Sequence, residues 1–229
     1  MAMERLKIYP ENKGPIRQFG LSLAKAVLAV TGVRDPELKI QDKSEWERQA
    51  SRFTELGFHN ELKLTKEEYL ASLPKFESQP KEYKGTLDTP LLVETRVPIQ
   101  RQAKLAGIDY LLTGLDKKDW PDDPKQYKTP DVPYTTWTDE GARFMNRRVQ
   151  DVRQELASFE RGGTEFDGVA SYIVKPQILE ERFLDLPGTA VGSDRAAYLL
   201  RWLGQAKLAL SFVGTAGPGF GSLVCGRKI

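Results

Sequence analysis

Four side chains near the C-terminal end of the sequence have the chemistry of a ligand site. Asp194 and Arg195 precede a β-like run, and Cys225 and Arg227 lie close to the last residue. The guanidinium fork of an arginine suits a carboxylate or a phosphate, and an aspartate can act as a base. A thiol beside cations can become a nucleophile because its pKa falls. These residues predict an anion site formed by Arg195 and Arg227, with Asp194 and Cys225 as candidate catalytic groups.

Each of the four residues also has a structural interpretation. Asp194, Arg195 and Arg227 could form salt bridges around a loop. A free cysteine is among the most buried residue types, so Cys225 could fill the core of a sheet. The glycine-rich segment from Gly214 to Gly221 could cradle a phosphate. A β-like run follows that segment, however, so a hairpin connection is the favoured interpretation.

Scarce histidine and cysteine exclude several mechanisms. His59 is the only histidine, so a Ser-His-Asp triad would have to contain it. Its position just after a helix favours a surface or helix-capping residue. One histidine and one cysteine cannot form a zinc site of these ligands in a monomer. The sequence has neither the phosphate-loop motif nor the Gly-x-Ser-x-Gly motif. We therefore expect neither a cofactor nor a metal.

The charge and hydropathy patterns bound the class of protein. Lys and Arg number 34 and Asp and Glu number 32, which leaves a net charge of +2. This balance gives no general reason to bind nucleic acid or an anionic membrane. The longest apolar stretch, residues 26–33, is far shorter than the roughly 18 residues of a membrane span. With no signal-like start and a single cysteine, we expect a soluble cytoplasmic protein that contacts neither nucleic acid nor membrane.

The first half of the chain reads mainly as helices. An apolar face at helical spacing predicts a helix from Pro15 to Val30. Two capping boxes, Ser44–Glu47 and Thr65–Glu68, predict helices that end at Gly57 and Leu73. A strand over residues 91–95, a helix over 98–106 and a weaker strand over 109–113 follow.

The second half combines helices with a C-terminal sheet. Apolar spacing predicts a long helix from Thr136 or Thr138 to Phe159, and Thr164 begins another helix toward Val174. Residues 198–203 and 207–213 form a predicted hairpin, and a last strand covers 222–227. Helices first and an antiparallel sheet last indicate the α+β class. We divide the chain into a mainly helical region with one or two strands (1–115), a loop (116–132) and a C-terminal part (133–229), which could also form one compact domain.

The C-terminal half carries a set of turn and hydrophobic motifs. They are Arg161–Thr164, Asp167–Ala170, Leu184–Gly188, Ala197–Leu199 with Trp202, and Gly221–Arg227. In this pattern, residues 133–229 resemble a family of uncharacterised, mainly bacterial proteins that share a domain of unknown function. The resemblance implies no catalytic residue.

Two function classes fit the sequence. The first is a non-enzymatic binding or protein-interaction module, which predicts an exposed apolar patch on residues 91–106 or on the helix from Pro15. The alternative is a binding protein for a small anionic ligand, or an enzyme, with its site near the C-terminal hairpin and the glycine-rich turn. Convergence of the four residues Asp194, Arg195, Cys225 and Arg227 in one pocket would favour the alternative.

Overall fold

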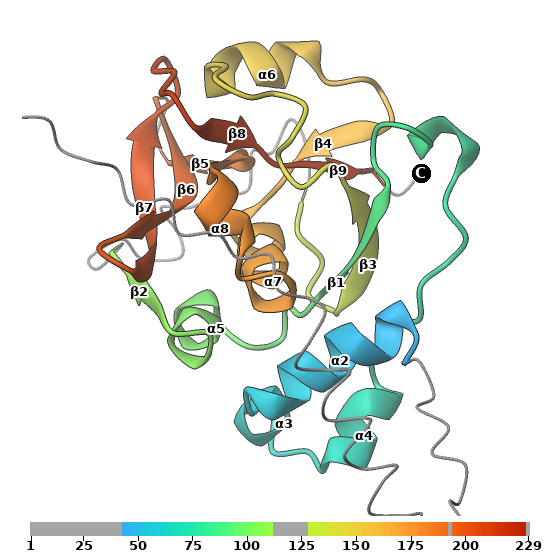
Figure 1. Cartoon of the computed structure of the whole chain (residues 1–229). Coiled ribbons are helices and arrows are strands. Elements are labelled where there is room, and N and C mark those ends of the chain that lie inside the picture. Colours follow the sequence, from blue (N-terminus) through green and yellow to red (C-terminus); the bar gives the residue numbers. More distant parts are fainter. Residues whose placement is uncertain (1–42, 112–127, 192–193, 228–229) are drawn as a thin grey trace, which may run out of the picture. The chain divides into compact units, whose positions relative to one another are not determined.

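The computed structural model describes residues 43–111, 128–191 and 194–227 (Figure 1). Its helices are α2 (Glu45–Glu55), α3 (Phe58–Glu61), α4 (Lys66–Ala71), α5 (Ile99–Leu105), α6 (Val149–Glu155), α7 (Glu165–Val174) and α8 (Ile178–Glu181), with a 3₁₀ turn η1 (Lys81–Tyr83). Its strands are β1 (Thr89–Val93), β2 (Ile108–Tyr110), β3 (Tyr134–Thr138), β4 (Glu160–Gly162), β5 (Phe183–Val191), β6 (Arg195–Trp202), β7 (Gln205–Phe212), β8 (Phe220–Ser222) and β9 (Val224–Gly226). The helix predicted from Pro15 and most of the predicted loop over 116–132 lie outside the described residues.

The strands form two sheets, which confirms the α+β class. One sheet has the antiparallel order β1-β3-β9-β4, and the other has the order β2-β7-β6-β5-β8. The second sheet is mixed, because β2 runs parallel to β7 and β8 runs parallel to β5. Strands β1 and β2 from the first half of the chain are therefore hydrogen-bonded to strands from the second half. None of the described helices is long and apolar enough to span a membrane.

Side-chain caps fix the starts of the main helices. Ser44 caps α2, Thr65 caps α4 and Thr164 caps α7, each in a complete capping box. Gly57 follows α2 with a φ of +86°, a backbone conformation that glycine adopts without strain. These helix starts confirm the sequence predictions. A capping box is a local signal, so a helix start can be predicted from it without knowledge of tertiary contacts.

The long helix predicted from Thr136 or Thr138 to Phe159 is wrong. Residues 134–138 form β3, in which the alternate residues Tyr134, Thr136 and Thr138 are buried. Left-handed φ angles then interrupt the chain at Glu140 and Gly141, and only α6 within this stretch is helical. The apolar residues that have helical spacing in the sequence belong to a strand, a turn and a short helix.

The hairpin connection predicted for the glycine-rich segment is also wrong. β7 pairs with β6 and β2, whereas β8 pairs with β5, on the other side of β6. The segment therefore carries the chain across the sheet. Gly221 is required there, because an added Cβ atom would lie only 2.1 Å from the carbonyl oxygen of Gly141.

Helix α7 forms the centre of the fold. It packs against β1 of one sheet and against β5 and β6 of the other, and all of its residues except Tyr172 and Val174 are buried (Figure 1). Gly168 allows the close approach to β5, since a Cβ atom there would come within 2.6 Å of the side chain of Leu186. Both ends of α7 are thus fixed relative to the sheets.

The five-stranded sheet contains a buried carboxyl group. Asp185 in β5 is 4% exposed and lies in register with Tyr198 of β6 and Ser222 of β8. No hydrogen bond to its side chain is present in the described part of the chain, and the Ser222 hydroxyl is also buried without a partner there. Burial raises the pKa of Asp185 to about 7, because an unpaired carboxylate is costly in an apolar environment.

We predict that Asp185→Asn flattens the dependence of stability on pH. Between about pH 4 and pH 7 the folded chain holds a proton at Asp185 that the unfolded chain has lost, so the free energy of unfolding falls as the pH rises. The expected loss is a few kcal/mol, on the order of 1.4 kcal/mol per pKa unit. Urea denaturation across this pH range measures the effect, with Asp194→Asn at an exposed carboxyl as the control. Parallel curves for the wild type and Asp185→Asn would contradict the prediction.

Candidate functional site

The four predicted site residues lie in two different sheets. Arg195 begins β6 in the five-stranded sheet, and its guanidinium lies 5.1 Å from the centroid of the Phe212 ring. Asp194 precedes it, whereas Cys225 and Arg227 lie in and just after β9 of the four-stranded sheet. In the described part of the chain, no hydrogen bond or ion pair joins the two pairs. The site predicted from their convergence therefore has no support from contacts between them.

The structure favours the structural interpretation of Cys225, and it holds Arg227 through its backbone. Cys225 is fully buried, and burial raises the pKa of its thiol well above the ordinary value, which keeps it protonated. The Arg227 amide donates to the carbonyl of Phe159, and its carbonyl accepts from the Tyr83 hydroxyl at 2.8 Å. His59 is buried next to Tyr69, so the surface position expected for it is wrong.

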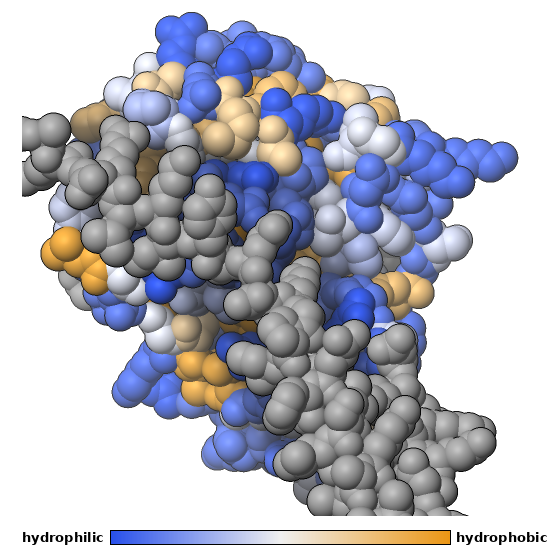
Figure 2. Space-filling view, viewed as in Figure 1, coloured by the Kyte–Doolittle hydropathy of each residue, from blue (hydrophilic) through white to orange (hydrophobic). Residues whose placement is uncertain are grey.

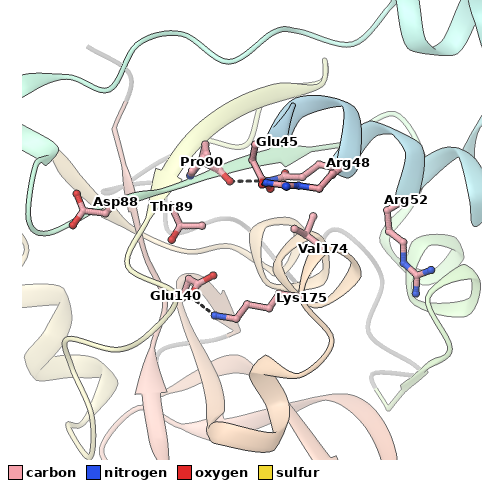
Figure 3. Close-up of a pocket in the computed structure, with 10 residues that line it drawn as sticks. Glu45, Arg48, Arg52, Asp88, Thr89, Pro90, Glu140, Val174 and Lys175 are labelled. Atoms are coloured by element: carbon pink, nitrogen blue, oxygen red, sulfur yellow. Dashed lines mark hydrogen bonds and ion pairs between the residues drawn. The ribbon is translucent and has the colours of Figure 1, made fainter. Parts of the chain in front are cut away.

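A cavity of about 440 Å³ lies between α2, β1 and the C-terminal end of α7 (Figure 3). Its size falls in the range of small-ligand sites. Three cationic and three acidic side chains surround it. The lining residues are Glu45, Arg48, Gln49, Arg52, Asp88, Thr89, Pro90, Glu140, Val174 and Lys175.

Gln49 fixes the wall between α2 and β1. Its side-chain amide donates to the Pro90 carbonyl, and its side-chain oxygen accepts from the Leu92 amide, both at 2.8 Å. β1 is the edge strand of its sheet, so this carboxamide takes the place of a further strand. Gln49 is 1% exposed. The cavity therefore has one rigid wall, on which Arg48 and Arg52 project from α2.

The cations of the cavity differ in how tightly the protein holds them. Arg48 pairs with Glu45 one helical turn away, and the Lys175 ammonium lies 2.6 Å from a carboxylate oxygen of Glu140. Among the described residues, Arg52 makes only long contacts, 3.4 Å from its Nε to the Ile173 carbonyl and 3.5 Å from Nη1 to Glu55. Hydrogen bonds of that length are weak. Arg52 is thus the cation with most capacity for a ligand.

A second cavity of about 310 Å³ shares Asp88 and Thr89 with the first. It is lined further by Gly85, Thr86, Thr138, Asp139, Ala142 and Arg143. Hydrogen bonds from Gln79 and from the Gly85 amide lower the pKa of Asp88, so this exposed carboxyl is ionised near neutral pH. Because the two cavities share part of their lining, they lie next to each other, and we call the two together the α2–α7 groove.

The turn after β3 contributes to the lining of both cavities. Oδ1 of Asp139 accepts from the amides of Gly141 and Val224, both at 2.9 Å, which ties the turn to β9. Burial raises the pKa of Asp139, although these backbone hydrogen bonds oppose the shift. Asp139 is therefore best understood as an anchor of the turn. Glu140 follows it in a left-handed conformation and lines the first cavity.

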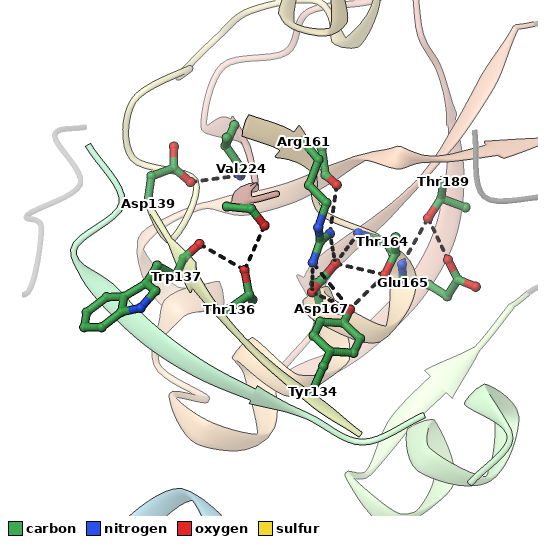
Figure 4. A network of polar contacts seen from close by, with 12 residues as sticks. Tyr134, Thr136, Trp137, Asp139, Arg161, Thr164, Glu165, Asp167, Thr189 and Val224 are labelled. Carbon is green, nitrogen blue, oxygen red and sulfur yellow. Dashed lines mark hydrogen bonds and ion pairs between the residues drawn. The ribbon is translucent and has the colours of Figure 1, made fainter. Parts of the chain in front are cut away.

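A buried polar network lies around the start of α7 (Figure 4). Arg161 in β4 makes two hydrogen bonds to the Asp167 carboxylate, at 2.6 and 3.0 Å, and both side chains are almost fully buried. Tyr134 and Thr164 also donate to that carboxylate. Burial alone would raise the pKa of Asp167, but the Arg161 guanidinium and these donors lower it instead. The network joins β3, β4 and α7.

Sequence reasoning missed the groove for identifiable reasons. Asp139 and Glu140 were assigned to the first turn of a long helix, and Arg48 and Arg52 have the spacing of an ordinary solvated helix face. The residue that could have given a signal is Gly141 directly after Asp139–Glu140, since this sequence is typical of a turn. Nothing local relates α2 to Lys175, because only the packed fold brings them together.

Comparisons with family models, with curated proteins and with solved structures found no match. The resemblance to a bacterial family of unknown function stays a prediction. Among the described residues, no group of three or more His, Cys, Asp or Glu side chains is placed to hold a metal ion.

We predict that Asp167→Asn destabilises the fold by about 3–5 kcal/mol, because Arg161 would keep a buried charge without its counter-ion. The double variant Arg161→Met with Asp167→Asn should lose less than the sum of the two single losses. Urea denaturation measures both. The control is Glu155→Gln, which removes an exposed pair with Arg147 and should cost well under about 1 kcal/mol. A loss for Asp167→Asn no larger than that of the control would contradict the prediction.

Proposed function

We propose that this chain binds a small ligand with an acidic group in the α2–α7 groove. The observation that carries the proposal is the convergence of Arg48, Arg52 and Lys175, from two helices, on one cavity of about 440 Å³. The expected anionic ligand is thus retained as a proposal, but at a different site from the C-terminal one. Arginine and lysine side chains at a concave surface are the usual means of holding a carboxylate or phosphate.

The balance of charges in the cavity limits the ligand. Glu45, Asp88 and Glu140 carry as many negative charges as the three cations carry positive ones. A polyanion would be repelled by the carboxylates, whereas a ligand with one acidic end and an uncharged polar remainder can contact both kinds of group. The second cavity, with the hydroxyls of Thr86, Thr89 and Thr138 in its lining, suits such a polar remainder.

We predict that glycerol phosphate stabilises the wild type against heat and that glycerol, at the same concentration, does not. A ligand that binds only the folded state raises the melting temperature by mass action. Arg52→Gln should weaken the binding of glycerol phosphate by roughly tenfold, the effect of one charge-assisted hydrogen bond. Arg201→Gln is the matched control, because Arg201 is an exposed arginine on β6 that pairs with Glu180. Equal shifts with both compounds, or equal affinities of the two variants, would contradict the proposal.

The β6–β7 turn supports a second proposed function, the expected protein interaction. Residues 91–106 do not provide the apolar patch expected there, because their large side chains, such as Leu92 and Val97, are buried. Trp202 and Leu203 are 59% and 92% exposed instead. Figure 2 shows a small hydrophobic patch near this turn, among several on this face. Leu203 has a φ of +51°, which costs a residue with a Cβ atom roughly 1–2 kcal/mol.

An exposed leucine in a strained turn suggests that a partner protein with an apolar pocket receives it. We predict that Leu203→Asn raises the free energy of unfolding by about 1 kcal/mol, because asparagine tolerates the left-handed conformation. Capture of a partner should be lost in the same variant, while Leu111→Asn at another exposed leucine retains it. Thermal denaturation and affinity capture from lysate measure the two effects. A variant that is stabilised and still captures the same proteins would rule out this interaction.

A further inference from the structure

Glu140 occupies an unusual position at the wall of the first cavity. It has a φ of +54°, in the left-handed region that favours glycine. Three contacts hold it there: its amide donates to the Thr138 hydroxyl at 3.1 Å, its carbonyl accepts from Arg182 at 3.1 Å, and its carboxylate lies 2.6 Å from the Lys175 ammonium. Figure 3 shows the Glu140 and Lys175 side chains, which both line the cavity, pointing toward each other.

The pair places a carboxylate of the protein where the acidic group of a ligand would bind. Both side chains line the cavity, and they are only partly buried, with 24% of Glu140 and 31% of Lys175 exposed. A pair with this exposure contributes little to stability and can separate at low cost. Lys175 would keep its place when Glu140 leaves, because it caps the C-terminal end of α7, where a cation is favourable.

We propose that Glu140 is a built-in competitor for the acid-binding part of the α2–α7 groove, and that the ligand which displaces it is a phosphate monoester. The inference rests on the proposed function. A monocarboxylate would gain from Lys175 only what Glu140 already gives, so the exchange would be close to neutral. A phosphate monoester carries up to two negative charges and three acceptor oxygens, and it can contact Lys175 and an arginine of α2 together.

This competition would also make the site selective. Glu140 excludes weak anions from Lys175, and the Asp88 carboxylate, which also lines the cavity, opposes ligands with further negative charges. An anion that uses Lys175 would then have to contact this lysine more strongly than Glu140 does. The residue that determines specificity is Glu140, although it would make no favourable contact with the bound phosphate.

The test measures glycerol phosphate binding by isothermal titration calorimetry near neutral pH, with the full chain and three variants. Glu140→Gln keeps the size of the side chain and removes its charge, so the affinity should rise roughly threefold, the effect of losing one partly exposed ion pair. Lys175→Met should weaken binding by roughly tenfold or more. Glu180→Gln, which removes an exposed acid of α8 that pairs with Arg201, should leave binding unchanged.

Two further measurements keep the test decisive. Glu140→Gly removes the same charge in a residue that tolerates the left-handed φ, so it should fold at least as well and tighten binding like Glu140→Gln. Lactate, a monocarboxylate, should gain no more than glycerol phosphate from either change, because both variants free the same ammonium for either ligand. Unchanged or weaker phosphate binding by both Glu140 variants would overturn the competitor role and leave the proposed function standing. If neither the wild type nor the Glu140 variants bind glycerol phosphate, both proposals fall.

Discussion

The ion pair between Arg161 and Asp167 is the interaction on which the position of α7 against the four-stranded sheet depends. A fully buried guanidinium and carboxylate are tolerated only when every charge has a partner, and here the pair is bidentate and receives further donors from Tyr134 and Thr164. The same carboxylate forms the capping box of α7. One side chain therefore sets the start of the central helix and its position relative to β3 and β4.

The consequences reach the groove at the other end of α7. Once Asp167 fixes the first turn, the ten residues of the helix carry Val174 and Lys175 to the α2 side of the molecule. Arg52 of α2 then contacts the Ile173 carbonyl, which satisfies part of the exposed end of the helix. Two of the three cations, Arg52 and Lys175, thus lie at the C-terminal end of a helix, where a positive charge is favourable.

The parts of the fold that the sequence predicted correctly are those with local signals. Ser44, Thr65 and Thr164 each combine with an acidic residue three positions later, and no distant contact is needed for these caps. β3 was missed because Thr136 and Thr138 read equally well as helix starts, and the left-handed turn at Glu140 is imposed by contacts with Arg182 and Lys175. The predicted site residues form two pairs that are close in sequence, Asp194 with Arg195 and Cys225 with Arg227, but the two pairs belong to separate sheets. The groove combines segments more than eighty residues apart in sequence, such as Gln49 and Glu140, which no spacing rule connects.

Equal numbers of cationic and acidic side chains around the cavity change what binding requires. A strongly positive pocket attracts any anion, and salt then screens it strongly. In a balanced pocket each cation is already engaged, so a ligand must replace an existing contact with a better one. The contact of Lys175 with Glu140 is the tighter one, and the contact of Arg52 with the Ile173 carbonyl is the looser one. A ligand would therefore engage Arg52 first and Lys175 second, and discrimination between ligands would arise at the second step.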